Sequence, residues 1–76
     1  MFNLEEITYN PNDKKYYSYF NRRLPDKSPQ FIELSFNVRR LSNVNCTLDN
    51  NDTETYIQGP SRDIVKETAE KINSSL

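Results

Sequence analysis

The side chains that most often carry out catalysis are scarce in this sequence. Histidine does not occur, so the usual general base near neutral pH and the commonest metal ligand are both missing. Cys46 is the single cysteine and Gly59 the single glycine, which argues against a zinc ligand set and against glycine-rich loops that hold phosphates. We therefore expect a protein that is not an enzyme and that uses no metal or cofactor.

Two further groups of reactive type have simple structural interpretations. Glu5 and Glu6 are adjacent, so on a strand they point to opposite faces and we expect them to be solvated rather than to form an acid–base pair. Cys46 lies with Val44 and Leu48 on the apolar side of its segment, where these residues alternate with polar ones. This pattern predicts a buried thiol with a raised pKa.

Charge is distributed unevenly along the chain. Residues 14–40 contain seven basic and two acidic residues, a net charge of +5, whereas residues 1–13 and residues 41–76 each carry −3. Aromatic residues gather in the same basic stretch, and tyrosine and arginine are enriched at the energetic centres of protein interfaces. We therefore predict one binding face made by Tyr16, Tyr17, Tyr19, Arg22, Arg23, Arg39 and Arg40.

Two functions would use such a face. The first is a non-catalytic protein-binding module that acts by occupying a partner's surface. Small acidic domains of this kind are typical of inhibitors that phages and mobile elements direct at host machinery, as anti-CRISPR proteins do, but no motif here matches an anti-CRISPR family. The second is single-stranded nucleic-acid binding, in which aromatic rings stack on bases and basic groups contact phosphates. Alternatively, the aromatics cover the core and the arginines pair with acids.

Periodic patterns predict the elements that would position these residues. Phe31–Arg40 is predicted to be a half-buried strand, because apolar residues in it alternate with polar ones. The apolar residues are Ile32, Leu34, Phe36 and Val38, and the polar ones are Glu33, Ser35, Asn37 and Arg39. Weaker alternation around residues 44–48 and a β-prone run at Thr53–Gln58 predict two more strands. The intervening residues 49–52, all Asp or Asn, favour a hairpin turn.

A first hairpin is expected upstream, with strands at Leu4–Tyr9 and Lys15–Arg23 joined by a turn at Asn10–Asp13. For residues 4–9, a helical turn is the alternative interpretation. Leu24–Pro29 is bracketed by prolines and is expected to form a loop.

The end of the chain predicts a helix from an N-cap at Ser61 to Leu76, with Glu67 four residues before Lys71 on the solvent side. The expected fold is therefore a single α+β domain over residues 1–76. It comprises a small antiparallel sheet of four or five strands, connected by hairpins and packed by one C-terminal helix.

Composition also suggests where the protein resides. A single cysteine excludes an intrachain disulfide, and the acidic N-terminal residues do not resemble a signal peptide. No stretch reaches transmembrane length. We therefore expect a cytoplasmic protein that does not bind membranes, whose partner is a protein or, alternatively, a nucleic acid. The exposed strand edges of a small sheet would also allow a homodimer to form through a sheet edge.

Overall fold

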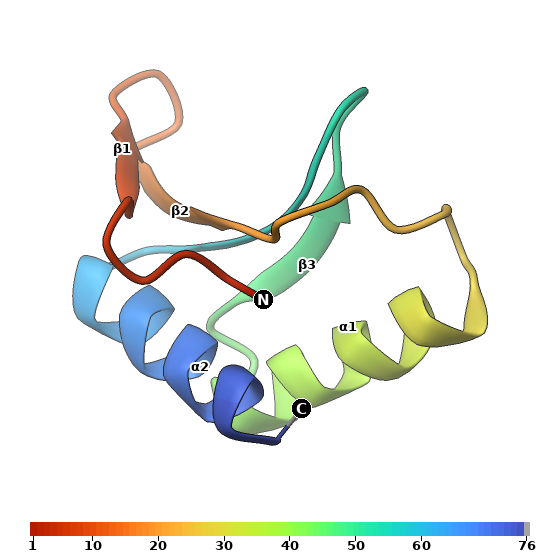
Figure 1. Ribbon diagram of the computed structural model, residues 1–76. Helices are drawn as coiled ribbons and strands as arrows, with labels where there is room; N and C mark the ends of the chain where they lie inside the picture. The colour runs from red at the N-terminus through yellow and green to blue at the C-terminus, as the bar shows by residue number, and fades with distance from the viewer. Residues whose placement is uncertain (76) are drawn as a thin grey trace.

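The computed structural model describes residues 1–75 (Figure 1). The chain forms two successive units, each a β-hairpin followed by a helix. In chain order the elements are β1 (Thr8–Asn10), β2 (Lys15–Tyr19), α1 (Pro29–Leu41), β3 (Thr47–Asn50), β4 (Thr55–Gly59) and α2 (Arg62–Ser75).

The four strands form one antiparallel sheet in the order β1-β2-β4-β3. Because β2 and β3 both run antiparallel to β4, α1 joins two parallel strands, with β4 inserted between them. Both helices lie on the same side of the sheet, and the opposite face is left uncovered (Figure 1). The predicted α+β class, the antiparallel sheet and the C-terminal helix packed on it are confirmed.

The predicted strand at Phe31–Arg40 is wrong, because these residues belong to α1. The Ser28 hydroxyl accepts a hydrogen bond from the Phe31 N–H at 3.2 Å, and Pro29 occupies the first helical position, where its missing N–H costs nothing. Only two of the four alternating apolar residues, Leu34 and Val38, are buried. They are four residues apart, a spacing that a helix and a strand both place on one face.

The other predicted elements occur with shifted bounds. The first hairpin forms, but its strands are shorter than predicted, and the turn is closed by a 2.8 Å hydrogen bond from the Lys14 N–H to the Asn10 carbonyl. The second hairpin turns at residues 51–54 rather than 49–52. Helix α2 begins one residue after Ser61, whose hydroxyl accepts from the Ile64 N–H at 3.1 Å. The predicted end at Leu76 lies outside the described residues.

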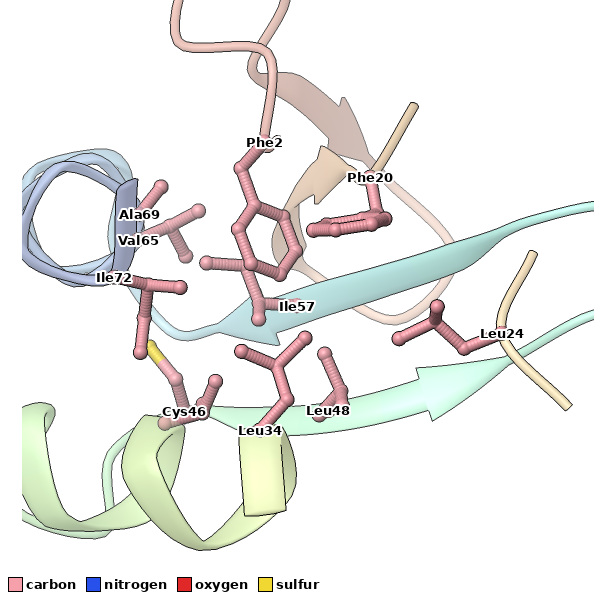
Figure 2. Packing of buried hydrophobic residues seen from close by; sticks show 11 residues of the cluster. Phe2, Phe20, Leu24, Leu34, Cys46, Leu48, Ile57, Val65, Ala69 and Ile72 are labelled. Atoms are coloured by element: carbon pink, nitrogen blue, oxygen red, sulfur yellow. The ribbon is translucent and has the colours of Figure 1, made fainter. Parts of the chain in front are cut away.

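The hydrophobic core lies between the sheet and the two helices (Figure 2). Strands contribute alternate residues to it: Ile57 from β4 packs with Leu48 from β3, while the neighbouring side chains point to the other face. Cys46 is fully buried, as predicted, and burial raises the pKa of its thiol. The buried hydrophobic residues are Phe2, Phe20, Leu24, Leu34, Val38, Cys46, Leu48, Ile57, Val65, Ala69 and Ile72.

The N-terminal segment is held against the end of α2. Phe2 pairs with Phe20 in an isolated bridge, and their rings meet edge to face with centroids 5.1 Å apart. The Asn73 side chain accepts from the Phe2 N–H at 3.0 Å and donates to the Phe2 carbonyl at 2.9 Å. One amide therefore satisfies both backbone groups of a residue far away in the sequence.

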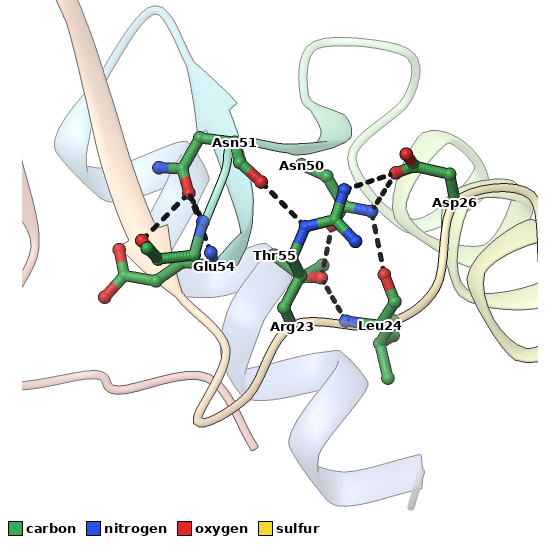
Figure 3. A network of polar contacts seen from close by, with 8 residues as sticks. Arg23, Leu24, Asp26, Asn50, Asn51, Glu54 and Thr55 are labelled. Carbon is green, nitrogen blue, oxygen red and sulfur yellow. Dashed lines mark hydrogen bonds and ion pairs between the residues drawn. The ribbon is translucent and has the colours of Figure 1, made fainter.

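A polar network joins the loop after β2 to the second hairpin (Figure 3). The Thr55 hydroxyl accepts from the Leu24 N–H at 2.8 Å and donates to the Asn50 side chain. The Asn50 amide donates to the Leu24 carbonyl at 2.8 Å and to Asp26 at 2.6 Å. Leu24 can therefore enter the core because its backbone polar groups are satisfied by side chains.

Candidate functional site

Three tyrosines meet on the sheet face that the helices leave uncovered. In β2, Tyr17 and Tyr19 alternate with the buried Ser18, and the register pairs Tyr19 with Tyr56 of β4. Because residues directly opposite each other share a face, all three rings project away from the core. We call Tyr17, Tyr19 and Tyr56 the tyrosine cluster.

The rings of the tyrosine cluster pack against one another. The Tyr17 and Tyr19 centroids are 6.3 Å apart with nearly parallel planes. Tyr56 is tilted against both, at 5.3 Å from Tyr17 and 5.8 Å from Tyr19. These separations are those of favourable aromatic pairs, so the cluster is a continuous half-buried surface rather than three independent side chains.

Carboxylates from separate segments border the cluster. Asp13 comes from the first turn, Asp49 from β3 and Glu54 from the second turn. A hydrogen bond to Asp13, together with its negative charge, raises the pKa of Tyr17 to about 12. The pKa of Tyr19 and the pKa of Tyr56 are also raised, mainly by burial and further by the surrounding carboxylates. Negatively charged side chains therefore surround the cluster.

A line of side-chain hydrogen bonds crosses the strands on this face of the sheet. The Tyr17 hydroxyl donates to Asp13 and also contacts Gln58 Oε1 at 3.3 Å. The Gln58 amide donates to Asp49 at 2.8 Å, and the Thr47 hydroxyl donates to the same Asp49 oxygen at 3.1 Å. This line fixes the positions of Tyr17 and Asp49 before any partner arrives.

The cluster forms the floor of a shallow hollow of about 370 Å³. Both hairpins extend on the side of the sheet away from the helices, so their turns border the uncovered face (Figure 1). The hollow is lined by Thr8, Tyr9, Asn10, Pro11, Tyr17, Tyr19, Asn51 and Tyr56. Such a surface suits an inserted side chain or loop better than a deeply enclosed small molecule.

The predicted binding residues do not form one face. Tyr17 and Tyr19 belong to the tyrosine cluster, but Tyr16 pairs with Gly59 on the helix-covered side and packs its ring on Tyr9, with centroids 4.9 Å apart. The strand alternation that places two tyrosines outward necessarily turns the third the other way.

The four predicted arginines lie outside the cluster. Arg23 donates to Asp26 and to the Asn51 carbonyl, so it holds the loop to the second hairpin. Arg22 contacts the Gln30 side chain at 3.4 Å. Arg39 and Arg40 lie in the last turn of α1, on the helix side of the sheet, beside Phe36. Folding thus separates these four arginines from the tyrosine cluster.

This geometry gives no support to stacking of nucleic acids on the tyrosines. Phosphates would meet Asp13, Asp49 and Glu54 at the cluster, and the basic residue that strand alternation adds to this face is Lys15 at the end of β2. Single-stranded binders combine aromatic stacking with a positively charged groove. The uncovered face has the rings but carries the opposite charge.

Sequence reasoning did not identify the carboxylates or Tyr56 as parts of a site. Tyr56 alternates with the buried Thr55 and Ile57, so its outward direction could have been inferred from the strand pattern. The carboxylates carried no such signal, because they come from three separate segments and meet only through the strand pairing.

Within residues 1–75, no group of three or more acidic or cysteine side chains is arranged to hold a metal ion. No helix in that range has the length and apolar character needed to cross a membrane. Comparison with models of known protein families, with curated proteins and with solved structures found no match.

Proposed function

We propose that the protein is a non-catalytic protein-binding module that acts by occupying its partner's surface with the uncovered sheet face. The observation that carries this proposal is the tyrosine cluster bordered by Asp13, Asp49 and Glu54. Three large aromatic side chains remain partly exposed on one side of a sheet whose other side carries both helices. Clustered, partly exposed tyrosines are typical of interface centres.

The chemistry of this face favours a partner segment that presents lysine or arginine. Carboxylates attract such groups over several ångströms and can accept hydrogen bonds from them, and tyrosine rings bind cations on their faces. Asp49 already holds two hydrogen bonds, from Gln58 and Thr47, whereas Glu54 on the second turn is placed at the border of the hollow's floor. The long aliphatic stems of basic side chains would cover the rings.

Preorganisation supports binding at this site. Tyr17 is held by Asp13 and Gln58, and its ring packs on both other members of the cluster. A side chain that is ordered before binding loses little conformational entropy on association. Inhibition would follow wherever the occupied surface is one that the partner needs, and a phage or mobile-element origin stays a prediction.

The test is affinity capture from a lysate of the native source, with tagged wild-type protein and two variants. Tyr19→Ser removes a ring from the cluster, whereas Phe36→Gln removes an exposed ring from α1, on the other side of the sheet, and serves as the matched control. We expect a stoichiometric protein partner to be retained by wild type and Phe36→Gln and to be lost from Tyr19→Ser. Circular dichroism checks that both variants are folded.

Three results would overturn the proposal. They are the absence of a stoichiometric partner, a partner that Tyr19→Ser retains as well as wild type does, and a captured species that is removed by nuclease. The last result would favour the nucleic-acid alternative, and labelled oligonucleotides at low ionic strength would then bind in a salt-dependent way.

A further inference from the structure

A second surface of the molecule exposes large apolar side chains with no covering element. On the outer side of α1, Ile32 and Phe36 are each 57% exposed, although Leu34 and Val38 of the same helix are buried. At 100° per residue, Phe36 points nearly opposite to the buried stripe. Its exposure therefore does not arise from incomplete packing at the edge of the core.

The end of α1 adds a third apolar residue in a conformation that valine rarely adopts. Val44 has φ of 59° and is 77% exposed. The Val44 N–H donates to the Arg39 carbonyl at 2.8 Å, and the Asn43 N–H donates to the Arg40 carbonyl at 3.4 Å. These two hydrogen bonds end the helix in a Schellman motif. Glycine would meet this backbone requirement without strain. The exposed Val44 side chain therefore extends the apolar surface of Ile32 and Phe36 at the end of α1.

Charged residues border the apolar patch on both sides along the helix. Glu33 precedes Phe36 by about one turn and Arg40 follows it by about one turn, and helical spacing puts both on the same flank of Phe36. Arg39 and Ile32 lie on the other flank. The ion pairs within residues 1–75 are Arg23–Asp26 and Glu67–Lys71, so in this range neither Glu33 nor Arg40 has an ion-pair partner.

We propose that a second copy of this chain covers the patch, with the two α1 helices packed antiparallel about a two-fold axis at Phe36. The patch is self-complementary in this arrangement. Each Glu33 faces Arg40 of the second copy, and the two-fold symmetry forms this ion pair twice. The two Phe36 rings meet at the centre, and the stem of each Arg39 covers Ile32 of the second copy.

The antiparallel arrangement explains why Glu33 lies one turn before Phe36 and Arg40 one turn after it. A parallel two-fold pairing would bring the flank of Glu33 and Arg40 onto the flank of Ile32 and Arg39. Arg40 would then face Arg39 of the second copy, which repels, and Glu33 would have no basic partner. The dimer would differ from one formed through a sheet edge, because β1 and β3 stay unpaired at their outer sides. It would also leave both tyrosine clusters free, so this inference does not rest on the proposed function.

The small area of this interface determines how tightly we expect the dimer to form. A helix of 13 residues is about 20 Å long, so one helix pair falls at the small end of specific interfaces. We therefore expect sedimentation equilibrium of the wild type to show a monomer–dimer transition between about 1 μM and 1 mM. Phe36→Gln, which keeps a helix-compatible side chain, should weaken the dimer by roughly thirtyfold or more.

Charge reversal tests the antiparallel register. Glu33→Arg and Arg40→Glu should each weaken self-association by about tenfold, because two attractive pairs become repulsive. Mixing the two variants should restore a heterodimer of wild-type strength, since every pair is then again between opposite charges. Glu70→Arg and Arg62→Glu make the same charge changes on the exposed side of α2 and should leave the dimer unchanged.

The proposal is overturned if the wild type remains monomeric across this concentration range, or if Phe36→Gln dimerises as strongly as the wild type. Failure of the mixed variants to associate more tightly than either alone would overturn the antiparallel arrangement. Circular dichroism of each variant distinguishes lost association from lost folding. An acidic partner of another sequence would bind the wild-type patch but would lose affinity for Arg40→Glu without rescue by Glu33→Arg.

Discussion

The phenol of Tyr17 shows how a single residue acquires its properties from the turn before its own strand. Asp13 accepts a hydrogen bond from the phenol and lies near it as a negative charge, and both effects favour the neutral form. The pKa of Tyr17 is therefore raised to about 12. Through Gln58 the same residue is connected to Asp49, so the tyrosine cluster is coupled to two of its bordering carboxylates.

We predict that Asp13→Asn lowers the pKa of Tyr17 from about 12 towards 10, because the strong hydrogen bond to a carboxylate and the negative charge are both removed. The asparagine oxygen can still accept from the Lys15 N–H, so the turn is retained. Ultraviolet titration of the phenolate near 295 nm measures this change, with Tyr17→Phe to assign the signal. An unchanged titration curve in Asp13→Asn would show that the carboxylate does not control this phenol.

The raised pKa of Tyr17 determines how its contribution to the free energy of unfolding changes with pH. Below pH 10, Tyr17 is protonated in both the folded and the unfolded state, and its contribution to stability is fully present. Between pH 10 and about 12 the unfolded chain releases the proton first, so this contribution falls and is lost above the folded pKa. Asp13→Asn should show a smaller loss of unfolding free energy across this window.

At the scale of elements, α1 is the segment whose local signals conflict. The alternation of apolar and polar residues over 32–39 favours a strand, whereas Ser28 and Pro29 form a helix start. The helix prevails because Phe31, Leu34, Val38 and Leu41 then make one stripe towards the core. In a strand, Ile32 and Phe36 would instead share the buried face with Leu34 and Val38.

We predict that Ser28→Ala lowers the free energy of unfolding by about 1 kcal/mol, because the Phe31 N–H loses its acceptor. Ser28→Asp should retain most of the stability, since aspartate also caps helices. Ser35→Ala, in the middle of α1, is the matched control and should be neutral or slightly stabilising. Urea denaturation followed by circular dichroism makes the comparison; equal midpoints for Ser28→Ala and Ser35→Ala would contradict the cap.

For the molecule as a whole, Gly59 marks where β4 approaches α2 and the segment before β3 most closely. A Cβ atom at this position would lie 2.7 Å from Cys46 Sγ and 3.0 Å from Val65 Cγ2. Its φ is not in the left-handed region, so the glycine is required by space rather than by backbone conformation. The sheet and its surroundings can close tightly here only because this side chain is absent.

We predict that Gly59→Ala destabilises the protein by about 1–3 kcal/mol through overpacking. In a Cys46→Ala background the sulfur is gone, so the added cost of Gly59→Ala should be clearly smaller. Thermal or urea unfolding of the four proteins gives the coupling energy of this double-mutant cycle. Strict additivity of the two substitutions would contradict the proposed contact.

Local sequence pattern alone determined much of this protein. It predicted both hairpins, the C-terminal helix with its Ser61 cap, the burial of Cys46 and the α+β class, because each depends on residues close together in the chain. Hairpin turns and caps are short-range interactions. The absence of histidine can likewise be read from the sequence without any structure.

Tertiary structure decided the identity of α1 and the composition of the candidate sites. The basic and aromatic stretch is continuous in sequence, but α1 carries Arg39 and Arg40 to the helix side, while strand alternation divides Tyr16 from Tyr17 and Tyr19. Carboxylates from distant segments reach the tyrosines only through strand pairing. The two helices bury one face of the sheet, so the face on which they pack decides which side chains of each strand stay exposed.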